Sequence, residues 1–250
     1  PLINKQEIVD NDAYGQGVIS DLAINPSSWA YKSVDYSNIP EDYIEKLFAK
    51  EGYVLNGGVY YKDSAPLSLG ILVNEGNPQK VNIANRISQY LNAAGISSYL
   101  TAVSYDEYVN RITNDNFELF VGEIAVDRGL NPAVMLTQDN YFNFDCSGID
   151  EVMTGLYGVS DKTKFKEGIN EFTQKFYANP PYIPIFFKTE SVIYGSYVSG
   201  ADAPTNICPF RNIEKWYFYD KDGKMAKGAE EQSENTPIPE ETEKDKTNEQ

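Results

Sequence analysis

The chain has 250 residues, with 37 acidic and 21 basic side chains, a formal net charge of −16 and no histidine. This charge makes nucleic acid and anionic membrane surfaces poor partners, because both are bound through basic patches that release counterions. The absence of histidine excludes Ser-His-Asp and Cys-His catalytic sites and removes the commonest ligand of zinc and nickel.

The N-terminal residues predict a short helix followed by a long loop. Residues 3–13 have a weakly amphipathic pattern that ends at Gly15. Residues 18–38 have no sustained period, and Trp29 among them either pins the loop to its own domain or lines a pocket. Because residues 1–15 show no signal-peptide pattern, we expect the chain to begin inside a larger protein.

A helix and a hairpin come next. Pro40 suits the first turn of a helix, and Gly52 suits the position just after its end. Asn56-Gly57-Gly58 lies between apolar residues, which predicts a β-hairpin over residues 54–62.

The middle of the chain predicts alternating strands and helices. Leu67, Leu69, Ile71 and Val73 alternate with other residues, which indicates a strand with one buried face. The predicted elements are strand 66–73, helix 78–94, strand 96–103, helix 105–113 and strand 117–122. This β-α-β-α-β order predicts an α/β fold with a mostly parallel sheet and flanking helices.

A carboxylate appears directly after the last of these strands. Asp127 and Arg128 follow a mainly apolar run, and Asn131-Pro132 then breaks the backbone. A strand that ends in a charged loop often presents that charge at the mouth of a sheet. The alternative is that Asp127 only forms the turn through its own backbone.

The C-terminal part predicts two helices, a strand and a polar tail. Helical character begins at about Ile149, Asp161 caps a longer helix, and residues 182–194 have the composition of a strand. Residues from 229 onward are rich in Glu and lack aromatic side chains, so we expect disorder there. The two cysteines lack CxxC spacing, and we interpret them as buried thiols, although their pairing stays open.

In this order the chain resembles a known family over about residues 1–219. The matching segments, in chain order, are NKQEIVDNDAYGQG, AKEGYVLNGGVYYKDSAPLSLGIL, IANRISQYLNAAGI, YDEYVNRITNDNFELFVGEIAVDRGLNP, GIDEVM, FTQKFYANPPYIPIFF and IEKWYF. The chain is similar to the C-terminal part of family 5 extracellular solute-binding proteins, the oligopeptide and dipeptide receptors of ABC importers. The resemblance implies the C-terminal lobe of a two-lobed periplasmic-binding-protein-like fold.

The resemblance also implies a domain organisation. Residues 1–188 would form the C-terminal ligand-binding lobe, without its start. Residues 189–219 would return to a first lobe that is absent here, and residues 220–250 would be a disordered acidic tail.

The resemblance further implies site residues. In peptide-binding members an acidic residue after this strand holds the ligand's α-amino group, and Asp127 matches it. Main-chain groups of Glu123 and Ala125 would pair with the ligand as an added strand. The family often has Trp three residues before the acidic residue, where this chain has Ile124, so the pocket wall and the ligand are open. The Glu123 carboxylate either favours cationic ligands or faces solvent.

The function implied is that of a non-catalytic, peptide-binding component of an ABC importer. Its partners would be a short peptide, the permease subunits and the N-terminal lobe of the same protein, without nucleic acid. It would be extracellular or cell-surface, a lipoprotein anchored through the absent N-terminal part, or periplasmic. No cofactor is expected, since the nickel or haem of some relatives is disfavoured without histidine.

Two alternatives remain at this point. One is a surface adhesion or signalling receptor that uses the same fold. The other is a hydrolase that uses Glu123 and Asp127 as paired carboxylates.

Overall fold

The computed structural model describes residues 2–33, 39–124, 136, 144–146, 148–205 and 208–219. The chain divides into two compact units, Pro1–Thr189 and Glu190–Gln250. The tail predicted over residues 220–250 lies outside the described residues. Within the described ranges, no helix has both the length and the apolar character that a membrane span requires.

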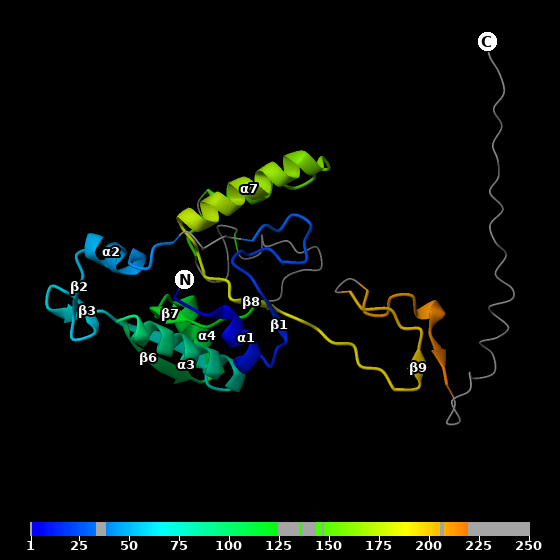
Figure 1. Ribbon diagram of the computed structural model, residues 1–250, viewed down its shortest axis with the longest axis horizontal. Helices are drawn as coiled ribbons and strands as arrows, with labels where there is room; N and C mark the ends of the chain where they lie inside the picture. Colours follow the sequence, from blue (N-terminus) through cyan, green and yellow to red (C-terminus); the bar gives the residue numbers. More distant parts are fainter. Residues whose placement is uncertain are drawn as a thin grey trace, which may run out of the picture. The chain divides into compact units, whose positions relative to one another are not determined.

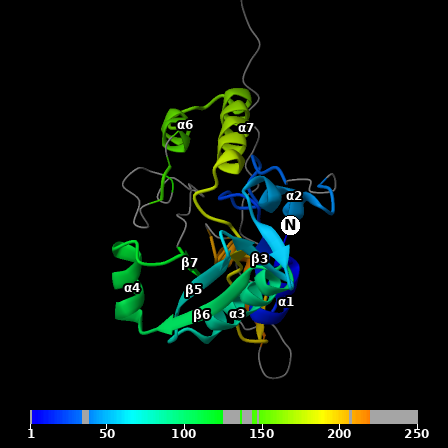
Figure 2. The ribbon, with the colours of Figure 1, turned by 90° about the vertical axis from the view of Figure 1, so that its left-hand side faces the viewer.

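A three-stranded parallel sheet forms the centre of the first unit (Figures 1 and 2). Its strand order is β6 (Ser97–Val103), β5 (Ser68–Asn74), β7 (Leu119–Phe120). Helices α3 (Pro78–Ala93) and α4 (Tyr105–Thr113) connect the strands in sequence. The predicted β-α-β-α-β order is therefore confirmed.

Local signals set the ends of these helices. The Asn77 side chain caps α3 by accepting a hydrogen bond from the Lys80 N–H at 3.0 Å. Ser104 caps α4 by accepting from the Glu107 N–H at 3.4 Å. Gly95 follows α3 with φ +83°, a conformation that a glycine adopts without steric penalty.

Strand β5 is buried on both faces, so the predicted single buried face is wrong. Ile71 and Val73 belong to a cluster that includes the apolar face of α3. Leu72 points to the other cluster, which includes Phe172 of α7 (Lys162–Ala178). A central strand of a parallel sheet is covered on both sides, which explains its nearly continuous apolar run.

Strand β7 is shorter than the predicted strand 117–122. Its register pairs Leu119 with Ile71 and Phe120 with Leu72. One residue earlier, the Glu118 carboxylate accepts the hydrogen bond of the Gly70 N–H. The Gly70 N–H therefore bonds to a side chain and not to a main-chain carbonyl of the neighbouring strand. Regular pairing of β7 with β5 begins at the next residue, Leu119.

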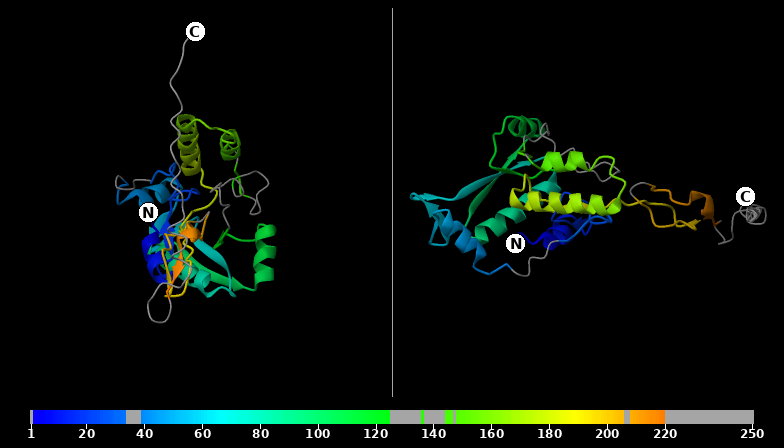
Figure 3. Two further views of the ribbon diagram at one scale, coloured as in Figure 1. Left: turned by 90° about the vertical axis from the view of Figure 1, so that its right-hand side faces the viewer. Right: turned by 90° about the horizontal axis from the view of Figure 1, so that it is seen from above.

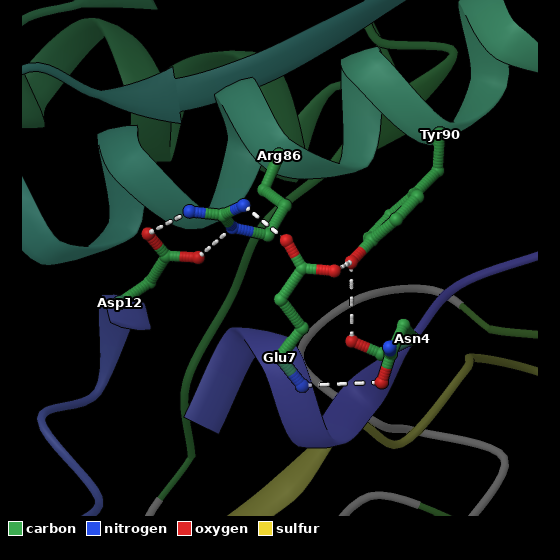
Figure 4. A network of polar contacts seen from close by, with 5 residues as sticks. All are labelled: Asn4, Glu7, Asp12, Arg86 and Tyr90. Carbon is green, nitrogen blue, oxygen red and sulfur yellow. Dashed lines mark hydrogen bonds and ion pairs between the residues drawn. The ribbon is translucent and has the colours of Figure 1, made fainter. Parts of the chain in front are cut away.

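A polar network fixes α1 (Lys5–Asp12) against α3 (Figure 4). Arg86 of α3 donates to Asp12 at 2.5 Å and to Glu7 at 2.6 Å. The Tyr90 hydroxyl donates to the other oxygen of Glu7 at 2.6 Å. The pKa of Tyr90 is raised to about 12, mainly by burial and to a lesser extent by this hydrogen bond. The hydroxyl therefore keeps its proton at neutral pH.

The predicted helix and hairpin before the sheet are both present. They are α2 (Tyr43–Lys50) and the antiparallel pair of β2 (Val54–Asn56) and β3 (Val59–Lys62), which β4 (Ala65–Pro66) extends. Gly57 and Gly58 connect β2 to β3 with positive φ angles of 58° and 83°. This geometry matches the two-residue turns that fit the twist of a hairpin.

Two further helices, α6 (Ile149–Gly155) and α7, lie side by side (Figures 2 and 3). Asp161 caps α7 by accepting from the N–H groups of Thr163 and Lys164, as predicted. The buried residues of α7 are Ile169, Phe172 and Phe176. Trp29 packs on Phe165 with ring centroids 5.4 Å apart, although 56% of its surface is exposed.

Two short strands that are far apart in the sequence form an antiparallel pair. β1 (Gly17–Ile19) overlaps the start of the predicted loop 18–38, and β8 (Phe186–Lys188) is the short paired part of the predicted strand 182–194. Their register pairs Gly17 with Lys188 and Ile19 with Phe186.

The second unit consists of short elements with many exposed apolar side chains. It contains β9 (Val198–Ser199), a 3-10 turn (Ile213–Lys215) and β10 (Tyr217–Phe218), and β9 pairs with β10. The large apolar side chains that are exposed there are Ile193, Tyr194, Tyr197, Phe210, Ile213, Phe218 and Tyr219. Cys208 is also exposed, in contrast to our interpretation of it as buried, whereas Cys146 is buried.

Candidate functional site

The carboxyl ends of the three parallel strands meet at one edge of the sheet. β5 ends at Asn74 and β6 at Val103, and the first turns of α3 and α4 follow directly. The Glu75 N–H donates to the Val103 carbonyl at 2.8 Å, which ties the two strand ends together. In open α/β sheets ligands bind outside this edge, so it is the first place to look for a site.

The chain that leaves β7 offers unpaired main chain at this edge. The Val121 N–H donates to the Leu72 carbonyl at 3.1 Å, and the Val121 carbonyl accepts from the Tyr108 hydroxyl at 2.9 Å. Gly122 and Glu123 are then exposed, and no described residue makes a hydrogen bond to the main chain of residues 122–124. Among the described strands, β7 pairs only with β5. Exposed main chain after a strand is the kind of segment to which extended peptides can add as a further strand.

The Glu123 side chain lies between two lysines from different elements. Its Oε2 is 3.2 Å from Nζ of Lys80, in the first turn of α3, and its Oε1 is 2.8 Å from Nζ of Lys188, at the end of β8. Partial burial alone would raise the pKa of Glu123. The hydrogen bonds and charges of the two lysines outweigh this effect and hold the pKa below its ordinary value.

The structure describes only some of the predicted site residues. Glu123 lies at the carboxyl edge of the sheet, and Ile124 is half buried against the cluster that contains Phe172. Ala125 and Asp127 lie outside the described residues. The Glu123 carboxylate has two cationic partners and is 41% exposed.

Sequence reasoning missed the two lysines. For Lys80 a signal exists, because a positive charge in the first turn of a helix opposes the helix dipole and requires a partner. For Lys188 no local signal exists, since only the pairing of β8 with β1 brings it near Glu123.

A separate cavity lies between the loop at Trp29 and helix α7. Its volume is about 230 Å³, and it is lined by Trp29, Ala30, Tyr31, Lys32, Lys166 and Asn170. The Lys166 ammonium lies 5.7 Å from the centre of the Trp29 ring, within the range of a cation–π contact. None of these residues belongs to the carboxyl edge, so this cavity is not the candidate site. Across the described part of the chain, no cluster of acidic or cysteine residues could hold a metal ion.

Comparison with known families gives one match. The family described as bacterial extracellular solute-binding proteins, family 5, middle part, matches residues 2–144. This range contains the whole parallel sheet and the segment that follows β7.

A curated relative matches over most of the chain. The oligopeptide-binding protein AppA of Bacillus subtilis is 21% identical over 228 residues, which cover 86% of this chain and 42% of that protein. The structure of AppA in complex with a nonapeptide is similar with a TM-score of 0.61, covering 88% of this chain and 46% of AppA. The chain thus spans less than half the length of this relative.

Other solved structures share the fold at lower identity. The periplasmic murein tripeptide binding protein MppA, in an unliganded open form, has a TM-score of 0.68 at 14% identity, over 87% of this chain and 42% of its own. NikZ from Campylobacter jejuni, in complex with Ni(L-His), has a TM-score of 0.64 at 17% identity, over 86% and 46%. These similarities confirm the predicted fold class. They leave the ligand open, since one of these structures holds a peptide and another a nickel complex.

Proposed function

The chain belongs to family 5 of the bacterial extracellular solute-binding proteins, and from this premise we propose that it binds short peptides as part of an ABC importer. In this proposal it is the C-terminal lobe of a two-lobed receptor, and the ligand lies in a cleft between the lobes. The observation that carries the proposal is the family match over residues 2–144, which includes the open main chain after β7.

The ligand would pair with the chain as an added strand. The exposed main chain of residues 122–124 supports this mode, because backbone hydrogen bonds bind peptides without selecting their side chains. We assign the main chain of Glu123 and Ala125 to this pairing. We assign the Asp127 carboxylate to the ligand's α-amino group, as the family resemblance implies.

The alternatives receive less support. A hydrolase that used Glu123 as its general acid would need a raised pKa at that carboxyl. Lys188 and Lys80 instead hold the pKa of Glu123 below its ordinary value. A receptor for adhesion or signalling is a second candidate with the same fold. The proposed partners of the importer component are its permease subunits, and the proposed location is the cell surface, with a lipoprotein anchor, or the periplasm.

For the domains we propose a binding lobe over residues 1–188, a segment 189–219 that completes the other lobe, and an acidic tail 220–250. The division of the chain after Thr189 supports this organisation. The exposure of apolar side chains after that division supports it too, because Ile193 is 93% exposed and Ile213 is 57% exposed. Monomers rarely expose large contiguous apolar patches that have no partner.

This organisation predicts the behaviour of the isolated chain. Because the segment 189–219 would lack its usual cover, the chain alone should bind a hydrophobic dye and self-associate at micromolar concentration. Fluorescence titration with such a dye and sedimentation velocity would measure both properties. Replacing Ile193 and Ile213 with Ser should reduce dye binding, whereas Thr205→Ala in the same unit should not. A monomer that binds no dye would show that this segment packs within the chain.

The function itself is tested by weighing the intact protein with its ligand. Native mass spectrometry of the full-length protein, purified from its source, should show additional masses that correspond to short peptides. Mild collisional activation should release them for sequencing. A released ligand that contained no amino acids would contradict the proposal.

A further inference from the structure

Glu123 connects three elements of the first unit through its position in the chain and its side-chain contacts. It follows β7, and its two carboxylate oxygens contact different lysines, Lys80 on α3 and Lys188 on β8. Each oxygen thus has one cation, and the carboxylate is held from two directions. Contacts to both oxygens restrict the orientation of the carboxylate more than a single ion pair does.

Lys188 connects this carboxylate to the end of the first unit. It is the last residue of β8, and Thr189 after it is the last residue of the unit. Two hydrogen bonds hold the flanks of β8 to the neighbourhood of β1. The Ser20 N–H donates to the Ile185 carbonyl at 3.1 Å, and the Thr189 N–H donates to the Gln16 carbonyl at 3.3 Å.

The ion pair is not needed to hold the fold together. The side chains of Lys188 and Glu123 are 44% and 41% exposed, and exposed ion pairs contribute little to stability. The pairing of β8 with β1 is made by main-chain groups, not by the lysine side chain. Because the pair contributes little to stability, the coupling that it can transmit is limited to a change of a few-fold in exchange rate.

We infer that Glu123 and Lys188 are positioning residues, whose ion pair couples the main chain of residues 122–124 to the junction between the two units. The inference rests on the proposed function, because Glu123 belongs to the main chain that is proposed to pair with the ligand. A peptide that pairs with this main chain holds Glu123 in place. Glu123 in turn holds Lys188, and with it the strand end that leads into the second unit.

Lys80 provides a matched control. It contacts the same carboxylate, but it lies on α3 and not next to the junction. Losing Lys80 should therefore loosen Glu123 without breaking the connection to β8. Losing Lys188 should break the connection while Lys80 still holds the carboxylate. Lys188→Arg keeps the charge and should restore the coupling.

Hydrogen exchange measured by mass spectrometry on the full-length protein tests the inference in two steps. Without ligand, Lys188→Gln should speed the exchange of amides in residues 186–190 by about two- to fivefold, the effect of a partly exposed ion pair. Lys188→Arg should exchange like the parent at these amides, and Lys80→Gln should too. Exchange in Lys188→Gln that equals the parent would overturn the inference, whether or not the protein binds peptides.

In the second step a short peptide with a free amine is added at saturation. In the parent, Lys188→Arg and Lys80→Gln, both residues 122–125 and residues 186–190 should gain protection. In Lys188→Gln, residues 122–125 should gain as much protection as in the parent, and residues 186–190 about two- to fivefold less. Equal gains at residues 186–190 in Lys188→Gln and in the parent would overturn the coupling. Absence of protection in the parent with every peptide would contradict the proposed function, and the ligand-free step would still test the ion pair.

Discussion

Phe172→Ala is expected to lower the free energy of unfolding by about 3–5 kcal/mol, the usual range for removing a buried aromatic ring. Phe172 is fully buried on α7, and its ring centroid lies 5.7 Å from that of Phe176. Its cluster also contains Leu22, Leu72 and Ile149, and these three residues and Phe172 come from four separate parts of the first unit. Removing the ring would leave a cavity that weakens the contacts among all four parts. Movement of one helix cannot restore these contacts. Urea denaturation of the chain, followed by circular dichroism, measures this change.

Tyr105→Ala is the matched control for this prediction. It also removes a large aromatic side chain from a helix of the first unit, but 64% of the Tyr105 surface is exposed. Its effect should stay within about 0.5 kcal/mol, as for most surface substitutions. Equal losses in the two variants would contradict the burial of Phe172. An unchanged m-value in both would show that the denatured state is the same.

The same pair of residues shows how far a sequence pattern predicts burial. Phe172 has helical spacing with Ile169 and Phe176 and is buried with them. Tyr105 has helical spacing with Tyr108 and Ile112, which favours an inward position, but it is exposed. Helical spacing gives the side of the helix on which a residue lies. Helical spacing does not show how far the neighbouring elements extend. At Tyr105, the first residue of α4, these elements do not cover the aromatic ring.

Elements with local causes were predicted well. The caps at Ser104 and Asp161 and the turn at Gly57-Gly58 depend on hydrogen bonds and backbone angles within a few residues. The sequence shows these residues directly, so the bounds of α4 and α7 follow from them. The order of elements then leaves few topologies for the sheet.

Elements with long-range causes were not predicted. The Glu118 carboxylate shortens β7 by accepting from Gly70, a residue of the central strand. β1 exists only because β8 returns to pair with it. The site has the same limit, since the position of Glu123 after the strand was predicted and its partners Lys80 and Lys188 were not. No periodicity links residues so far apart in the sequence.

The sharpest prediction for the site concerns the charge of Asp127. A ligand ammonium enclosed between two lobes needs a charged partner, because an unpaired buried charge is very unfavourable. Asp127→Asn keeps the shape of the side chain and removes its charge. Truncating one partner of such a pair typically costs about 2–5 kcal/mol of binding free energy. This corresponds to a loss of affinity of about thirtyfold to several thousandfold.

Arg128→Gln is the control, because it changes the charge of the adjacent residue in the predicted loop. Adjacent loop side chains usually diverge, so we expect Arg128 to act as a rim charge and its loss to change affinity by about threefold or less. Calorimetry on the full-length protein, with a short peptide and with the same peptide N-acetylated, separates the two roles. Acetylation removes the ammonium, so it should weaken binding to the parent strongly and to Asp127→Asn only slightly. Equal affinity of the parent and Asp127→Asn for the free-amine peptide would show that Asp127 only shapes the turn.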